Sequence, residues 1–131
     1  MRGEKEVEKV SIVKCSSYNL KKVDKAVAKC LSLINFDASR YYRKKILIKP
    51  NIVGSFPKKQ VACTTNPSII EAICKIFKKQ KCEIFIGDSP FTNPQVSFKA
   101  AGIDRLKKYG KLVILEQEKQ IQIKDSKASV L

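Results

Sequence analysis

Two short segments of the sequence contain polar residues that could bind a charged ligand. The first segment reads ILIKPNIVGSFPKKQVACTTNP and the second reads IFIGDSP. The candidate ligand-binding residues in them are Lys49, Asn51, Thr64, Thr65, Asp88 and Ser89. A lysine ammonium suits a phosphate or a carboxylate, and amide and hydroxyl side chains donate hydrogen bonds. The aspartate could instead hold a divalent metal, a ribose hydroxyl or a substrate amine. Together, the lysine, amide and hydroxyl side chains of these segments predict an anion site.

The same residues are also ordinary turn chemistry, because Asn and Asp bond their own backbone and Pro fixes φ. The clustering of polar residues after two predicted strands favours the binding interpretation over ordinary turns. No catalytic residue can be named, because the sequence lacks paired carboxylates at a known spacing and a nucleophile with its base. By elimination, acid–base chemistry would fall to Asp88 or Lys49. The spaced glycines of a dinucleotide fingerprint and a Walker sequence are also absent.

The elements that must position these residues follow from the spacing of apolar side chains. Short apolar, β-branched runs predict strands at residues 10–16, 45–49, 82–90 and 111–117. Apolar residues three and four apart predict helices at residues 20–34, 67–79 and 95–101. Asn19, Asn66 and Asn93 are suited to cap those helices, and prolines follow the last two.

Strands that alternate with helices predict an α/β fold with a parallel sheet. We expect about four strands in a three-layer domain with helices on the faces of the sheet, and we expect this sheet to be incomplete. In such sheets ligands bind outside the carboxyl ends of the strands. The loops after Lys49 and after Gly87 are therefore where a ligand is expected.

Composition fits one globular domain spanning residues 1–131, with residues 118–131 as an irregular tail. The chain has 131 residues, of which 44% are hydrophobic and 30% charged. No apolar run approaches the roughly 20 residues of a membrane helix, and the N-terminus, MRGEKEVEKV, lacks the apolar stretch of a signal peptide. We therefore expect a cytoplasmic location and no membrane partner.

A net charge of +15 suggests an alternative role, a basic module that binds nucleic acid or an acidic partner. The distribution of the charge does not favour nucleic acid. Lysines fall on helix faces and after strands, and aromatic residues are not interleaved with them as a stacking platform requires. The lysines concerned include Lys21, Lys22, Lys25, Lys29, Lys78, Lys79, Lys81, Lys107, Lys108 and Lys111.

The cysteines do not form a recognisable metal or iron–sulfur site. They are Cys15, Cys30, Cys63, Cys74 and Cys82, an odd number without a Cys-x-x-Cys unit. We expect reduced thiols, with Cys15, Cys30 and Cys74 acting as small hydrophobic residues. Cys63 lies in the polar loop and is the one candidate for a reactive thiol. The chain has no histidine to activate it.

The wording of four segments resembles the family called domain of unknown function 362. These segments are ILIKPNIV, ACTTNPSIIEAI, IFIGDSP and AAGI, and the resemblance extends over about residues 8–117. Many members carry a ferredoxin-like pair of four-iron clusters elsewhere in the chain, so the resemblance implies a redox-linked setting and a ligand- or cofactor-binding domain. The cofactor itself stays unknown.

Three departures from the family qualify that expectation. The resemblance covers the N-terminal half of the family domain, so the chain is expected either to be an inactive fragment or to need an oligomer or a missing partner segment. The ferredoxin-type cysteine run is absent, so no cluster ligand is carried over. Asn66 stands where members often have histidine, which keeps the capping role without a proton carrier.

Overall fold

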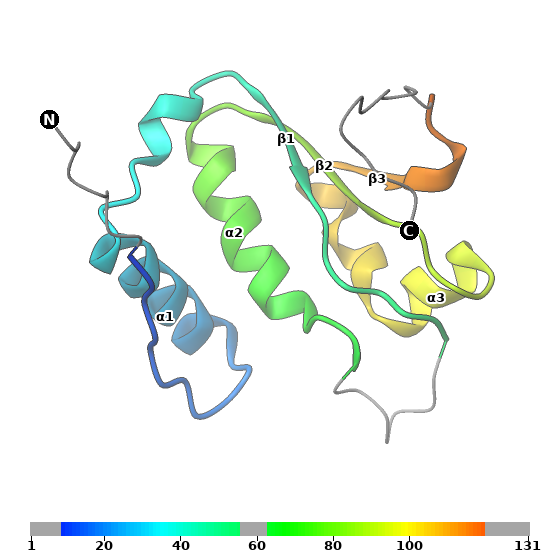
Figure 1. Ribbon diagram of the computed structural model, residues 1–131, viewed down its shortest axis with the longest axis horizontal. Coiled ribbons are helices and arrows are strands. Elements are labelled where there is room, and N and C mark those ends of the chain that lie inside the picture. Colours follow the sequence, from blue (N-terminus) through cyan, green and yellow to red (C-terminus); the bar gives the residue numbers. More distant parts are fainter. Residues whose placement is uncertain (1–8, 56–62, 120–131) are drawn as a thin grey trace, which may run out of the picture.

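The computed structural model describes residues 9–55 and 63–119, which form a parallel sheet with helices packed on it (Figure 1). The elements in chain order are α1 (Leu20–Leu33), η1 (Ala38–Tyr41), β1 (Lys45–Ile48), α2 (Pro67–Lys79), β2 (Glu83–Asp88), α3 (Pro94–Ala100), η3 (Ile103–Lys108), β3 (Lys111–Ile114) and η4 (Leu115–Gln117). The predicted α/β class is confirmed. None of the helices in these two ranges is long and apolar enough to cross a membrane.

The sheet has the strand order β1-β2-β3, and both pairs are parallel. Ile46 lies opposite Ile84, and Ile86 lies opposite Leu112, so the apolar side chains of one face line up across the strands. Because successive strands are added in one direction by right-handed crossovers, α2 and the α3–η3 pair lie on the same face. All three strands therefore end at one edge of the sheet. A helical layer on the other face stays a prediction.

The core lies between this face and the helices. Its buried residues are Ile52, Ile70, Cys74, Cys82, Ile84, Ile86, Phe98, Ile103 and Leu106. Ile70 and Cys74 of α2 are four positions apart, so they lie on one stripe of the helix and reach the sheet together. The helix α1 packs beside α2 rather than under the strands (Figure 1).

The predicted helix starts are confirmed at all three positions. The side chains of Asn19, Asn66 and Asn93 accept hydrogen bonds from backbone amides of the first turns of α1, α2 and α3. Proline occupies the first turn of α2 and of α3, where its missing N–H costs nothing. These local bonds fix where the crossover helices begin, just after the loops that were expected to bind a ligand.

The predicted strand at residues 10–16 is wrong. This segment forms no strand, and Val10 and Ile12 are 85% and 90% exposed. Its β-branched composition fits a pleated surface, but strand formation also needs a neighbouring edge, which it does not contact here. The predicted strand at 111–117 ends at Ile114, after which Leu115–Gln117 form η4. The short helices η1 and η3 were not predicted. The predicted tail at 118–131 lies outside the described residues except for its first two.

A buried carboxylate on α2 joins this helix to η3. Glu71 is 5% exposed, and its Oε1 accepts a hydrogen bond of 2.9 Å from the Tyr109 hydroxyl and lies 3.1 Å from Lys108 Nζ. Its Oε2 lies 3.5 Å from the Arg105 guanidinium. Burial alone would raise the pKa of Glu71, but these donors outweigh it and lower the pKa. Burial and the contact with Glu71 also raise the pKa of Tyr109 to about 12.

We expect Glu71→Ala to lower the free energy of unfolding by about 2 kcal/mol, because the Tyr109 hydroxyl loses its acceptor in a buried site. Lys108 and Arg105 are more than half exposed, so their ion pairs add little. Glu71→Gln keeps an acceptor and is expected to cost less than Glu71→Ala. Urea denaturation of both variants at neutral pH measures the difference, and equal stabilities would contradict the role assigned to this hydrogen bond.

Candidate functional site

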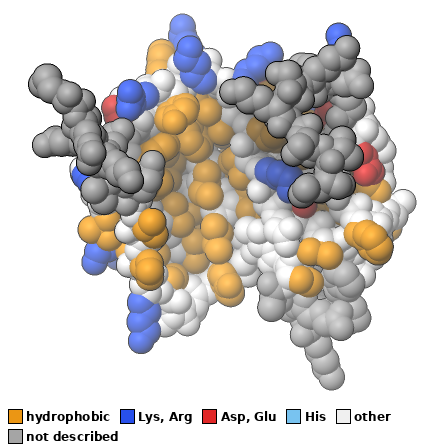
Figure 2. Space-filling view, viewed as in Figure 1, with side chains coloured by type: hydrophobic (Ala, Val, Ile, Leu, Met, Phe, Trp, Pro, Cys, Tyr) orange, Lys and Arg blue, Asp and Glu red, His pale blue; other side chains and the backbone are white. Residues whose placement is uncertain are grey.

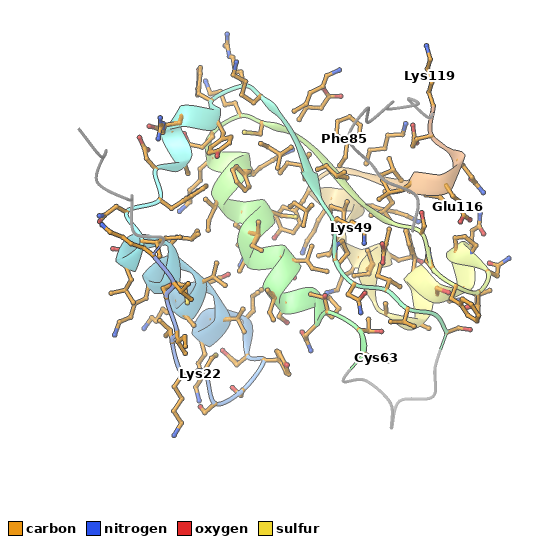
Figure 3. The ribbon with its side chains drawn as sticks, viewed as in Figure 1. Lys22, Lys49, Cys63, Phe85, Glu116 and Lys119 are labelled. Atoms are coloured by element: carbon orange, nitrogen blue, oxygen red, sulfur yellow. The ribbon has the colours of Figure 1, made fainter. Side chains whose placement is uncertain are left out.

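An ion pair joins the carboxyl ends of β1 and β2. Lys49 follows β1 directly, Asp88 is the last residue of β2, and Lys49 Nζ lies 2.6 Å from Asp88 Oδ1. The Lys49 side chain is 58% exposed, whereas that of Asp88 is 7% exposed. Figure 3 shows Lys49 just past the end of its strand. The structure thus brings together two candidates that are far apart in the sequence.

Asp88 is held by backbone donors as well as by Lys49. Its Oδ2 accepts a 2.6 Å hydrogen bond from the amide of Ile52, and the amide of Ser89 also donates to the carboxylate. Burial would raise the pKa of Asp88, but the hydrogen bonds from Lys49, Ile52 and Ser89 outweigh it and lower the pKa. These donors hold the carboxylate in its charged form, and the carboxylate in turn fixes the position of the Lys49 ammonium.

Two further candidates bind each other across the loop that follows β1. The amide of Asn51 donates to Thr65 Oγ1 at 2.9 Å, and the amide of Thr65 donates to the carbonyl of Asn51 at 2.9 Å. Asn51 Nδ2 donates to the carbonyl of Cys63 at 2.7 Å. An isolated antiparallel bridge between Ile52 and Thr64 continues this pairing. The two ends of the loop are closed on each other, and its middle, residues 56–62, lies outside the described residues.

The loop after β1 also binds the loop after β2. The amide of Phe91 donates to the carbonyl of Val53 at 2.8 Å, and the amide of Ser55 donates to Thr92 Oγ1 at 3.1 Å. Thr92 Oγ1 lies 2.9 Å from Oγ of Ser97, which is fully buried in α3. Sequence reasoning missed Thr92 and Ser97. The one signal was the Thr-Asn-Pro helix start, which marks where α3 begins but does not say which hydroxyl reaches the neighbouring loop.

The amides at the start of α2 are largely used by the protein itself. Thr65 donates to Asn51, while Ser68 and Ile69 donate to the side chain and carbonyl of Asn66. The backbone amides of Thr65, Ser68 and Ile69 are therefore not available to a ligand. Pro67 has no amide hydrogen to offer. What α2 still provides at this edge is the positive end of its dipole.

Three polar groups at this edge keep donors for a ligand. The Lys49 ammonium uses one N–H to contact the Asp88 carboxylate, and the side chain remains more than half exposed. Within residues 9–55 and 63–119, no hydrogen bond engages the side-chain hydroxyl of Thr64 or of Ser89. Thr64 is half-buried and Ser89 exposed. Of the predicted residues, Lys49, Thr64 and Ser89 could therefore contact a ligand. The other three, Asn51, Thr65 and Asp88, form hydrogen bonds within the protein that fix the two loops.

The cysteines stay apart from this edge except for Cys63, whose carbonyl binds Asn51. None of the five forms a disulfide, and within the described ranges no three His, Cys, Asp or Glu side chains gather as a metal site would require. Cys74 is buried as expected, and burial raises the pKa of its thiol to about 11. Cys15 is exposed, so its expected role as a small core residue is wrong.

A family model with the description "Domain of unknown function (DUF362)" matches residues 46–130. The matched span begins inside β1 and includes the six candidate ligand-binding residues. No curated protein and no solved structure matches the chain.

Proposed function

We propose that this chain, which belongs to the family described as Domain of unknown function (DUF362), binds a small anionic ligand at the carboxyl edge of its sheet. Lys49 supplies the positive charge, and the hydroxyls of Thr64 and Ser89 supply hydrogen bonds. The ligand class is a carboxylate or a phosphate, which includes the phosphate group of a cofactor in a redox-linked reaction.

The observation that supports the proposal is the fixed position of an exposed cation. A surface lysine normally loses considerable side-chain entropy when it is ordered by a ligand. Here the buried carboxylate of Asp88 already holds Lys49 Nζ at 2.6 Å, while the side chain stays 58% exposed. The remaining ammonium donors are therefore oriented before a ligand arrives.

The same ion pair sets the expected strength of binding. Asp88 neutralises Lys49, so the attraction for an anion must come from the oriented N–H groups, the α2 dipole and the net charge of +15. These contributions are individually small. We therefore expect weak binding of a simple anion, on the order of a millimolar dissociation constant, or about −4 kcal/mol.

Isothermal titration of the full chain with inorganic phosphate, pyrophosphate and citrate tests the proposal. Lys49→Ala is expected to weaken binding by roughly tenfold or more. Lys45→Ala is the matched control, because Lys45 belongs to the same strand but lies at its amino end, 3.8 Å from Glu83. Equal weakening in both variants, or none in Lys49→Ala, would show that general charge rather than this site binds the anion.

A further inference from the structure

An apolar groove lies between α1, α2 and the extended segment before α1. It encloses about 620 Å³, and no charged residue lines it. Its floor includes Val27, Cys30, Leu31, Ile69, Ile73 and Phe77. Figure 2 shows the hydrophobic side chains of this face gathered over α1 and α2, left of the centre of the view. A surface of this kind is where another chain or ligand is expected to bind.

The groove lies beside the outer edge of β1. Ile69 and Ile73 of α2 line it, and each precedes by one position a residue that packs under the sheet, Ile70 or Cys74. The groove stripe of α2 therefore adjoins its core stripe. Since α1 lies on the opposite side of α2 from η3, and η3 packs against β3, α1 lies beyond β1 (Figure 1). A further strand added to the sheet next to β1 would therefore lie over the groove and cover α1 and α2.

The edge of β1 that faces this position has no strand partner in the described residues, where β1 pairs only with β2. An open edge presents unpaired N–H and C=O groups to which an extended segment can add. The apolar floor and the open edge thus point to the same kind of occupant, an extended strand.

Charge around the groove indicates the chemistry of that strand. Lys44 precedes β1, and Lys45, its first residue, forms only an exposed pair with Glu83. An adjoining hollow of about 310 Å³ shares Val13, Cys15 and Ser16 with the groove and carries four lysines and no acidic residue. These are Lys14, Lys22, Lys25 and Lys29. A second copy of this chain, with its own net charge of +15, would be repelled here.

We propose that this groove binds an extended segment of a partner protein in which apolar and acidic side chains alternate. Its backbone pairs with the open edge of β1, its apolar side chains fill the floor between α1 and α2, and its carboxylates meet the surrounding lysines. Alternation follows from the geometry, because successive side chains of a strand point to opposite faces. The site is independent of Lys49 and of anion binding at the carboxyl edge.

A synthetic peptide of about twelve residues, with isoleucine or valine alternating with glutamate, is the probe. Fluorescence anisotropy with the labelled peptide and the full chain is expected to show binding that weakens as salt is raised. The same peptide with lysine in place of glutamate is expected not to bind. Bound acidic peptide is expected to slow alkylation of Cys30 by iodoacetamide and to protect the β1 amides from hydrogen exchange, since Cys30 lines the groove.

Matched variants locate the binding. Val27→Asp places a charge in the groove and is expected to weaken peptide binding by roughly tenfold or more. Ala28→Asp is the control on the next residue of α1, outside the groove lining and exposed. The triple variant Lys22→Gln, Lys25→Gln, Lys29→Gln changes only exposed side chains, so it preserves the fold, and it is expected to weaken binding as well.

Several results would overturn the proposal. Absence of acidic-peptide binding, equal binding of the lysine peptide, or equal loss in Val27→Asp and Ala28→Asp would each do so. Salt-sensitive binding of a labelled single-stranded oligonucleotide that the acidic peptide does not displace would assign the lysines to nucleic acid instead. Protection of the β1 amides without peptide, or a dimer in sedimentation, would show that the chain itself occupies the edge.

Discussion

Gly87→Ala is expected to lower the free energy of unfolding by about 3 kcal/mol, because the added methyl group has no room in the sheet. Gly87 lies in the central strand β2, opposite Val113 of β3. A Cβ atom at Gly87 would run into Cγ2 and the carbonyl oxygen of Val113. The carbonyl belongs to the backbone, so β2 and β3 would have to separate. Asp88 is the next residue and would move with the strand.

Urea denaturation measures this loss, and Gly102→Ala is the comparison. Gly102 has a left-handed backbone with φ 69°, and a Cβ atom there would lie 3.4 Å from Cγ of Pro67, which is ordinary contact. The expected cost is about 1 kcal/mol, from backbone strain alone. If Gly87→Ala were as stable as Gly102→Ala, the close approach of β2 and β3 at Val113 would be contradicted.

Asp88→Ala is expected to lower the free energy of unfolding by about 2–3 kcal/mol, because the amides of Ile52 and Ser89 lose their acceptor. Ile52 is 1% exposed, so water does not readily replace the carboxylate there. Lys49 is half exposed, so the ion pair itself contributes little of this loss. Asp88→Ala is also expected to weaken anion binding, since Lys49 would no longer be oriented.

The pH dependence of stability separates the charge of Asp88 from its shape. Asp88→Asn keeps an acceptor of similar size but cannot ionise. The pKa of Asp88 is lowered in the folded protein, so its charge stabilises the fold above the unfolded value of about 3.9 and this contribution is lost as pH falls through the folded pKa. The stability gap between wild type and Asp88→Asn, measured by urea denaturation, should therefore shrink below about pH 4.

A gap that stays constant from neutral to acidic pH would contradict that account. Glu83→Gln serves as a control, because Glu83 forms only an exposed pair with Lys45 at 3.8 Å. Its effect on the free energy of unfolding is expected to stay within about 0.5 kcal/mol.

The parts of the fold that local chemistry determines could be predicted from the sequence. The caps Asn66 and Asn93 and the prolines after them act within one helical turn, so α2 and α3 begin where expected. The apolar runs of β1 and β2 also gave the correct strands. The strand prediction for residues 10–16 was wrong because apolar, β-branched side chains indicate that a segment can pair. They do not indicate whether a strand edge lies close enough for pairing. That depends on how α1 packs.

The candidate site was predicted as a location but not as a set of free donors. Parallel strands end at one edge, which is why Lys49 and Asp88 could be expected together. That Asn51 and Thr65 bind each other depends on how the loop closes over 14 residues, and no local pattern records this. The role of Asp88 as an acceptor for Ile52, 36 residues away, was hidden for the same reason. Tertiary pairing decides which polar groups remain available.

The most direct test of the central claim is a ¹H–¹⁵N correlation NMR titration of the full chain with pyrophosphate. We expect the amide signals of Lys49, Thr64 and Ser89 to shift most, and we expect these shifts to disappear in Lys49→Ala but to persist in Lys45→Ala. Shifts confined to the lysine-rich face of α1 around Lys22 and Lys29, or no saturable shift at the carboxyl edge, would contradict it.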